Sequence, residues 1–93
     1  VSSLEELAAF LTADPSRRVL LVGHTDAVGS LAANTELSRK RAAAAESYLR
    51  ARGIPAGQLG AQGAGYLSPV ASNLTPEGRE ENRRIEAILL PPE

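Results

Sequence analysis

The sequence has no cysteine, one histidine and only three aromatic residues among its 93 positions. Without cysteine, neither a disulfide nor a thiolate metal site can form, and the redox compartment stays open. Because His24 is the only histidine, a multi-histidine metal site is excluded, and we predict no metal and no cofactor. The core must be built from leucine, valine, isoleucine and alanine, which suits a thin sheet-and-helix core better than a deep cavity.

A charge excess and long apolar runs are also missing. Ten basic residues stand against eleven acidic ones, and the net charge is −1. A general nucleic-acid-binding protein would show a clustered positive excess, so we expect no nucleic-acid partner. The apolar stretch at 19–23 is far shorter than the roughly 20 residues that span a bilayer. The chain starts at Val1, so the lack of a signal-peptide pattern does not indicate where the protein resides.

Hydrophobic spacing and turn residues predict three helices and three strands in a single domain, residues 1–93. The helices are expected over 3–13, 34–52 and 76–82, and the strands over 18–22, 59–64 and 84–90. Thr75, an N-cap residue followed by Pro76, predicts the start of the third helix. The order is α-β-α-β-α-β, a sheet with helices stacked on it.

Asp26 lies just after the first strand and before the long helix. In open α/β sheets, ligands bind outside the carboxyl ends of strands, so a binding role is one interpretation of this carboxylate. The structural alternative is an Asx-turn, in which the carboxylate accepts a hydrogen bond from its own loop.

Arg41 lies on or beside the apolar stripe of the long helix, where arginine is unexpected because it is rarely buried without a partner. The stripe is expected to comprise Leu37, Ala44, Ala45, Tyr48 and Leu49. The side chain could pack its stem and extend its head to water, or form a structural pair with Asp26. Alternatively, Asp26 binds the ammonium and Arg41 the carboxylate of a zwitterionic ligand. Spacing alone does not choose between these interpretations.

Enzyme motifs are weak in this sequence. His24 and Asp26 are two residues apart, which does not define a catalytic triad, because a triad is recognised by its geometry. The segment at 63–65 lacks the remaining glycine and the following helix of a dinucleotide-binding motif. We therefore expect no enzyme activity and no catalytic residue.

A longer pattern includes the same residues. Gly23-His-Thr-Asp26-x-x-Gly29-x4-Asn34-x2-Leu37-Ser38-x2-Arg41-Ala42 resembles the central motif of OmpA-like peptidoglycan-binding domains. That family includes peptidoglycan-associated lipoprotein and the flagellar stator protein MotB. The second half of the family pattern is matched in order and spacing by Gly63-x-Gly65, Pro69, Asn73 and Thr75-x2-Gly78-Arg79-x2-Asn82-Arg83-Arg84-Ile85-Glu86. The resemblance covers nearly the whole chain.

The resemblance implies an α+β fold, a two-layer sandwich with helices on one face of a small mixed β-sheet. It also implies a non-catalytic domain that binds the meso-diaminopimelate residue of the peptidoglycan stem peptide. At the matching positions, Asp26 would bind the diaminopimelate ammonium and Arg41 its carboxylate. The supporting pocket positions would be Thr25, Gly29, Asn34, Leu37, Ser38, Asn82 and Arg83. From the residues alone, Asn34 could instead cap the helix, and Ser38 could be an ordinary first-turn residue.

The start of the chain departs from the family pattern. Family members usually open with a strand before the first helix, whereas this chain begins at the helix. The sheet would then have an open edge that could pair with another chain. The alternative function is therefore a protein–protein interaction or dimerisation module, and a homodimer is one such assembly. The family implies a place in the periplasm, at the outer membrane or envelope of a Gram-negative bacterium. The domain would lie outside the membrane and anchor a membrane protein or lipoprotein to the cell wall.

Overall fold

The structure is a computed structural model that describes residues 2–91, with side chains from Leu4 onward. It contains helices α1 (Ser2–Ala13), α2 (Leu31–Ala51) and α3 (Pro76–Asn82), a 3-10 turn η1 (Ala56–Gln58), and strands β1 (Arg18–His24), β2 (Leu59–Gly65) and β3 (Arg84–Leu90). The predicted element order is confirmed. Five boundaries differ from the expected ones. Three of them differ by one residue, whereas β1 ends two residues later and α2 begins three residues earlier than expected. No helix in the described part of the chain is long and apolar enough to cross a membrane.

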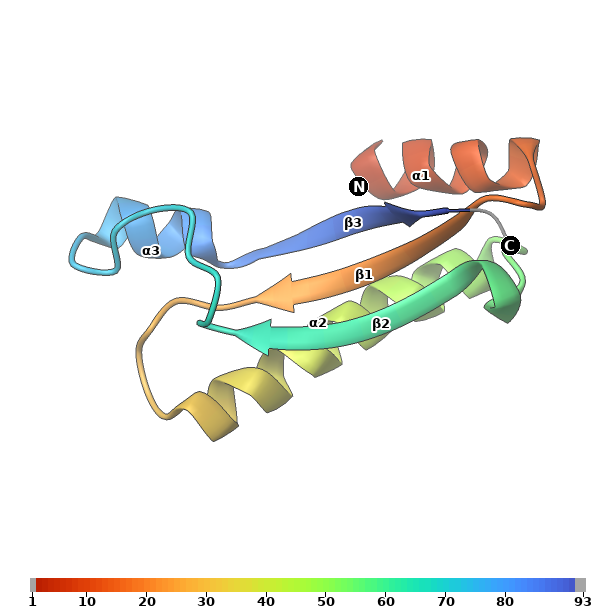
Figure 1. Cartoon of the computed structure of the whole chain (residues 1–93). Coiled ribbons are helices and arrows are strands. Elements are labelled where there is room, and N and C mark those ends of the chain that lie inside the picture. The colour runs from red at the N-terminus through yellow and green to blue at the C-terminus, as the bar shows by residue number, and fades with distance from the viewer. Residues whose placement is uncertain (1, 92–93) are drawn as a thin grey trace.

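The three strands form one mixed sheet in the order β2-β1-β3 (Figure 1). The central strand β1 pairs in parallel with β2 and antiparallel with β3. The carboxyl ends of β1 and β2 therefore lie next to each other, at the end of the sheet where α3 lies in Figure 1. The strand β3 occupies one edge and pairs only with β1 among residues 2–91.

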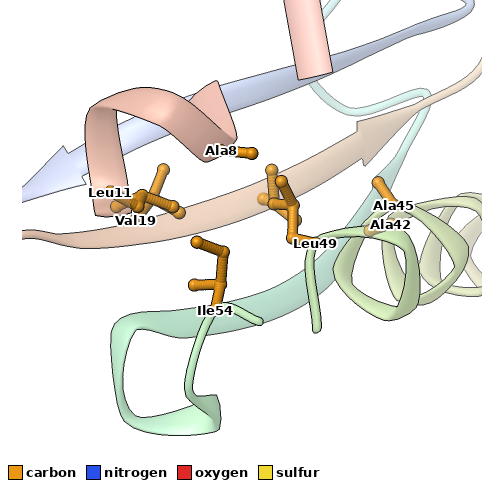
Figure 2. Close-up of a cluster of buried hydrophobic side chains, with 8 residues drawn as sticks. Ala8, Leu11, Val19, Ala42, Ala45, Leu49 and Ile54 are labelled. Atoms are coloured by element: carbon orange, nitrogen blue, oxygen red, sulfur yellow. The ribbon is translucent and has the colours of Figure 1, made fainter. Parts of the chain in front are cut away.

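The helices α1 and α2 cover the same face of the sheet, because side chains from both meet those of β1 in one aliphatic cluster (Figure 2). Its buried members are Ala8, Leu11, Val19, Leu21, Ala42, Ala45, Leu49 and Ile54. This confirms the predicted α+β sandwich with a thin aliphatic core.

The buried stripe of α2 differs from the one expected. Leu37 is 41% exposed and Ala44 is exposed, whereas the stripe consists of Asn34, Ser38, Ala42, Ala45 and Leu49. Ala45 and Leu49 are buried as predicted, whereas Leu37 and Ala44 are not. The prediction missed the polar members because it counted only apolar residues, and Asn34 and Ser38 make their hydrogen bonds inside the fold. Arg41 consequently lies one position outside the stripe and is exposed.

The first half of α2 lies very close to the ends of β1 and β2. A Cβ atom on Gly23 would lie 2.1 Å from the carbonyl oxygen of Ser38, and one on Gly63 would lie 2.5 Å from the backbone nitrogen of Arg39. Both neighbours are backbone atoms of a helix, which cannot move aside without displacing the helix itself. Glycine at these two positions therefore sets the distance between α2 and the sheet, beside the loop that carries Asp26.

Candidate functional site

Asp26 uses both of its carboxylate oxygens inside the protein. Oδ1 accepts a hydrogen bond from the backbone N–H of Val28 at 3.1 Å, which confirms the predicted Asx-turn. Oδ2 accepts from Arg83 Nη1 at 2.5 Å, a partner 57 residues away in sequence. The Val28 N–H first, and then Arg83, hold the pKa of Asp26 below its usual range. Asp26 is therefore a carboxylate at neutral pH, with only 14% of its side chain exposed.

Arg41 does not pair with Asp26, so the structural pair, one of the three interpretations that spacing left open, does not form, and Arg83 is the partner of Asp26. Arg41 is exposed and makes no ion pair or side-chain hydrogen bond with another described residue. It nevertheless borders the same groove as Arg83, a depression of about 910 Å³. Apolar side chains from α1, β1 and β3 make up most of its wall: Leu4, Leu7, Phe10, Leu21, Ala87 and Leu89. The groove therefore combines an apolar wall with arginine side chains at its border.

The loop that carries Asp26 is tied to the end of β2 by Thr25. The backbone N–H of Thr25 donates to the carbonyl oxygen of Gly65 at 2.8 Å, and its hydroxyl donates to the carbonyl oxygen of Asp26 at 2.9 Å. Gly29 then turns the chain with φ of +92°, a conformation that side chains other than glycine rarely adopt. Thr25 and Gly29 thus shape the loop that carries Asp26.

Asn34 closes the same loop from α2. Its Nδ2 donates to the carbonyl oxygens of Val28 at 2.7 Å and Ser30 at 3.0 Å. The interpretation of Asn34 as the helix cap is wrong, since Ser30 is the N-cap and its hydroxyl accepts from the backbone N–H of Ala33. The helix begins earlier than expected because a loop serine provides the cap, which frees the asparagine to hold the loop.

Ser38 and Leu37 differ in burial, although they are neighbours on α2. Ser38 is fully buried, donates to the carbonyl oxygen of Thr35 at 2.8 Å and accepts from the backbone N–H of Gly65 at 2.9 Å. It is therefore not an ordinary first-turn residue, because it joins α2 to the end of β2. Leu37 lies on the exposed side of the helix, with no polar atom in its side chain.

Asn82 is fully buried on α3 and holds the segment at 70–73 by hydrogen bonds. Its Oδ1 accepts from the backbone N–H groups of Val70 and Ala71, and its Nδ2 donates to Asn73 Oδ1 at 2.9 Å. The same Asn73 oxygen accepts from the backbone N–H of Ala27 at 3.1 Å, next to Asp26. Sequence reasoning gave Asn73 no role in the site, although it stands in the matched pattern. Asn73 and Asn82 together fix the loop at Ala27 to the segment before α3.

The His24 side chain contacts Glu86 on β3 rather than Asp26. Nε2 lies 2.6 Å from Glu86 Oε1, although not along a ring N–H hydrogen-bond direction, and Arg84 donates to the same carboxylate oxygen at 3.0 Å. Burial, and then the positive charge of Arg84, lower the pKa of His24, partly opposed by Glu86. No group of three or more potential metal ligands occurs among residues 2–91.

Known proteins share this sequence pattern and this fold. The pattern of the OmpA family matches residues 1–83. Peptidoglycan-binding protein ArfA of Mycobacterium tuberculosis is 43% identical over 86 residues, which cover 92% of this chain and 26% of ArfA. Outer membrane protein A of Bordetella avium is 41% identical over 83 residues, which cover 89% of this chain and 43% of that protein.

A solved structure agrees with the arrangement described above. The crystal structure of the peptidoglycan-associated lipoprotein from Burkholderia pseudomallei superposes with a TM-score of 0.90 at 31% identity, covering 94% of this chain and 74% of that one. This chain spans about a quarter of ArfA and less than half of the Bordetella protein. With nearly all of its residues matched in sequence and in fold, the chain belongs to the OmpA family.

Proposed function

We propose that this chain is a non-catalytic module that binds peptidoglycan and anchors an envelope protein to the cell wall. The ligand group is the diaminopimelate side chain of the stem peptide. Its ammonium binds Asp26 and its carboxylate binds Arg41. One observation carries the proposal: the ionised carboxylate of Asp26 pairs with Arg83, and Arg83 lines a groove that is also bordered by Arg41, an arginine without an ion partner among the described residues.

The relatives support the same function. ArfA is named as peptidoglycan-binding, and the Burkholderia protein as peptidoglycan-associated. Location at the outer membrane of a Gram-negative bacterium, facing the periplasm, rests on the Bordetella relative named as an outer membrane protein. The tether would be a membrane protein or lipoprotein, as in the lipoprotein from Burkholderia.

The supporting residues act by holding the loop. Thr25, Asn34 and Asn82 take part in hydrogen bonds that fix the backbone beside Asp26 or the segment behind it. Preorganised groups lose less entropy when a ligand binds. Leu37 would contribute apolar surface at the outer side of α2.

The expected affinity for one stem peptide is modest. A hydrogen bond to a charged group contributes roughly 1.5–3 kcal/mol, from which the cost of ordering the ligand is subtracted. A dissociation constant between about 1 μM and 1 mM follows for a single stem. A wall that offers many identical stems raises the effective affinity without new contacts.

Sedimentation with purified sacculi containing diaminopimelate tests the two-residue site. Asp26→Ala and Arg41→Ala are expected to abolish binding and to leave the circular dichroism spectrum unchanged. Lys40→Ala is the matched control, because Lys40 is an exposed cation next to Arg41 on α2. Binding of both alanine variants at the parent level would refute the site. Release of soluble fragments from the sacculi would refute the non-catalytic part of the proposal.

A second candidate, pairing of two copies through β3, is favoured by the apolar residues of this edge strand. Ile85 is 42%, Ile88 46% and Leu89 58% exposed, and the outer edge of β3 is not paired with any strand in residues 2–91. Sedimentation equilibrium tests it. A dimer that Leu89→Lys dissociates would support pairing, and a monomer at millimolar concentration would refute it.

A further inference from the structure

The free site already holds a cation where the ligand ammonium is proposed to bind. Arg83 donates to one oxygen of Asp26, and the Val28 N–H donates to the other. Asp26 is largely covered, whereas 42% of the Arg83 side chain is exposed. A ligand ammonium that takes the position of Arg83 Nη1 at Asp26 Oδ2 must displace Arg83, which is the more exposed of the two partners.

The other arginines of the groove differ in their partners. Arg41 has no ion pair or side-chain hydrogen bond with a described residue, whereas Arg84 donates to the Ser68 carbonyl oxygen at 2.9 Å and to Glu86 at 3.0 Å. Displacement of Arg83 would give the groove a second guanidinium without a counter-ion. Glu6, an exposed residue on α1, also lines the groove but holds neither arginine in an ion pair.

The exchange at Asp26 therefore depends on what else the ligand carries. A ligand with only an ammonium forms one ion pair and breaks another, and it leaves Arg83 uncompensated beside a second positive charge. A ligand that carries a carboxylate on the same carbon as the ammonium compensates this charge, because a carboxylate binds a guanidinium through two parallel hydrogen bonds. The same groove would thus accept a zwitterion and disfavour a simple amine.

We propose that Arg83 is a specificity-determining residue, an internal competitor for Asp26 that makes binding depend on an ammonium and a carboxylate in the same ligand group. The proposal rests on the function proposed above, in which Asp26 binds the ligand ammonium. It predicts discrimination between two kinds of stem peptide. A side chain that ends as diaminopimelate does is zwitterionic, whereas one that ends as lysine does carries an ammonium alone.

Calorimetric titration with two tripeptides tests this role. The probes are L-alanyl-γ-D-glutamyl-meso-diaminopimelate and the same peptide with L-lysine in the third position. For the parent chain we expect the diaminopimelate peptide to bind at least ~30-fold more tightly, about 2 kcal/mol. Arg83→Gln should strengthen binding of the lysine peptide several-fold and reduce the ratio by about tenfold. Arg83→Lys, which keeps a cation near Asp26, should retain most of the preference.

Two controls separate this role from others. Arg50→Gln removes the same charge from an exposed position in the last turn of α2 and should leave the ratio unchanged. Thermal unfolding of each variant establishes that the fold is kept. If Arg83→Gln weakens both peptides equally, or leaves the ratio at the parent value, Arg83 is no competitor and the inference is wrong. If the parent binds neither peptide, the proposed function itself fails.

Discussion

Replacement of Asn82 by alanine should destabilise the domain strongly, although this residue contacts no ligand in the proposed function. The change removes four hydrogen bonds: Oδ1 accepts from the N–H groups of Val70 and Ala71, and Nδ2 donates to the Ala71 carbonyl oxygen and to Asn73. Asn82 is fully buried, so water cannot easily replace the lost partner. Each hydrogen bond contributes roughly 1 kcal/mol net, and a buried donor left without a partner costs about 1–3 kcal/mol.

The expected loss in the free energy of unfolding is therefore about 3–4 kcal/mol. A domain of this length has a total stability of roughly 5–14 kcal/mol, so the variant should lie close to its unfolding limit. At about 4–8 °C for each kcal/mol, the midpoint of thermal unfolding should fall by at least ~12 °C. Urea unfolding followed by far-ultraviolet circular dichroism measures the loss, and suits a chain without tryptophan.

The matched control is Glu81→Ala, an exposed residue next to Asn82 on α3, which should change the stability by less than ~0.5 kcal/mol. A loss below ~1 kcal/mol for Asn82→Ala, close to that of the control, would refute the reasoning. It would mean that the segment at 70–73 does not depend on this side chain for its position.

Two further predictions concern stability. Gly23→Ala should lower the free energy of unfolding by about 2 kcal/mol or more, because its Cβ would lie 2.1 Å from the Ser38 carbonyl oxygen. The control Gly57→Ala, with no atom within 4 Å of its Cβ, should lower it by less than ~1 kcal/mol, and equal urea midpoints for the two variants would contradict this. The pKa of His24 is lower in the folded chain than its ordinary 6.5, so the unfolded chain binds the proton first as pH falls. Stability should therefore be complete above about pH 6.5 and decrease below it toward the folded pKa, and His24→Asn should flatten the stability between pH 7.5 and 5.5. If stability changes with pH in this range as much in the His24→Asn variant as in the parent chain, the pH dependence comes from other groups.

The fold could be predicted well because local signals agree with it. The strand at 84–90 has alternating side chains, the helix at 76–82 has a threonine cap followed by proline, and the structure shows both with the predicted bounds. The predicted start of the long helix was wrong because Ser30 and Asn34 are both good capping residues. The sequence does not tell which of the two side chains accepts a hydrogen bond from a backbone N–H of the first helical turn. The apolar stripe was correct at Ala45 and Leu49 but missed Asn34 and Ser38 for a related reason. The sequence does not tell whether a polar side chain is exposed or is buried with its hydrogen bonds satisfied.

The sequence by itself determined the element order, the family pattern and the two charged residues, Asp26 and Arg41, to which the proposed site is assigned. Only the tertiary structure decided which arginine pairs with Asp26, because the answer depends on how the junction of α3 and β3 meets the loop after β1. Arg83 is 57 positions from Asp26, and no local pattern encodes a contact over that separation. Spacing along one helix locates Arg41 relative to its neighbours, whereas an ion pair depends on where two distant elements place their side chains in space.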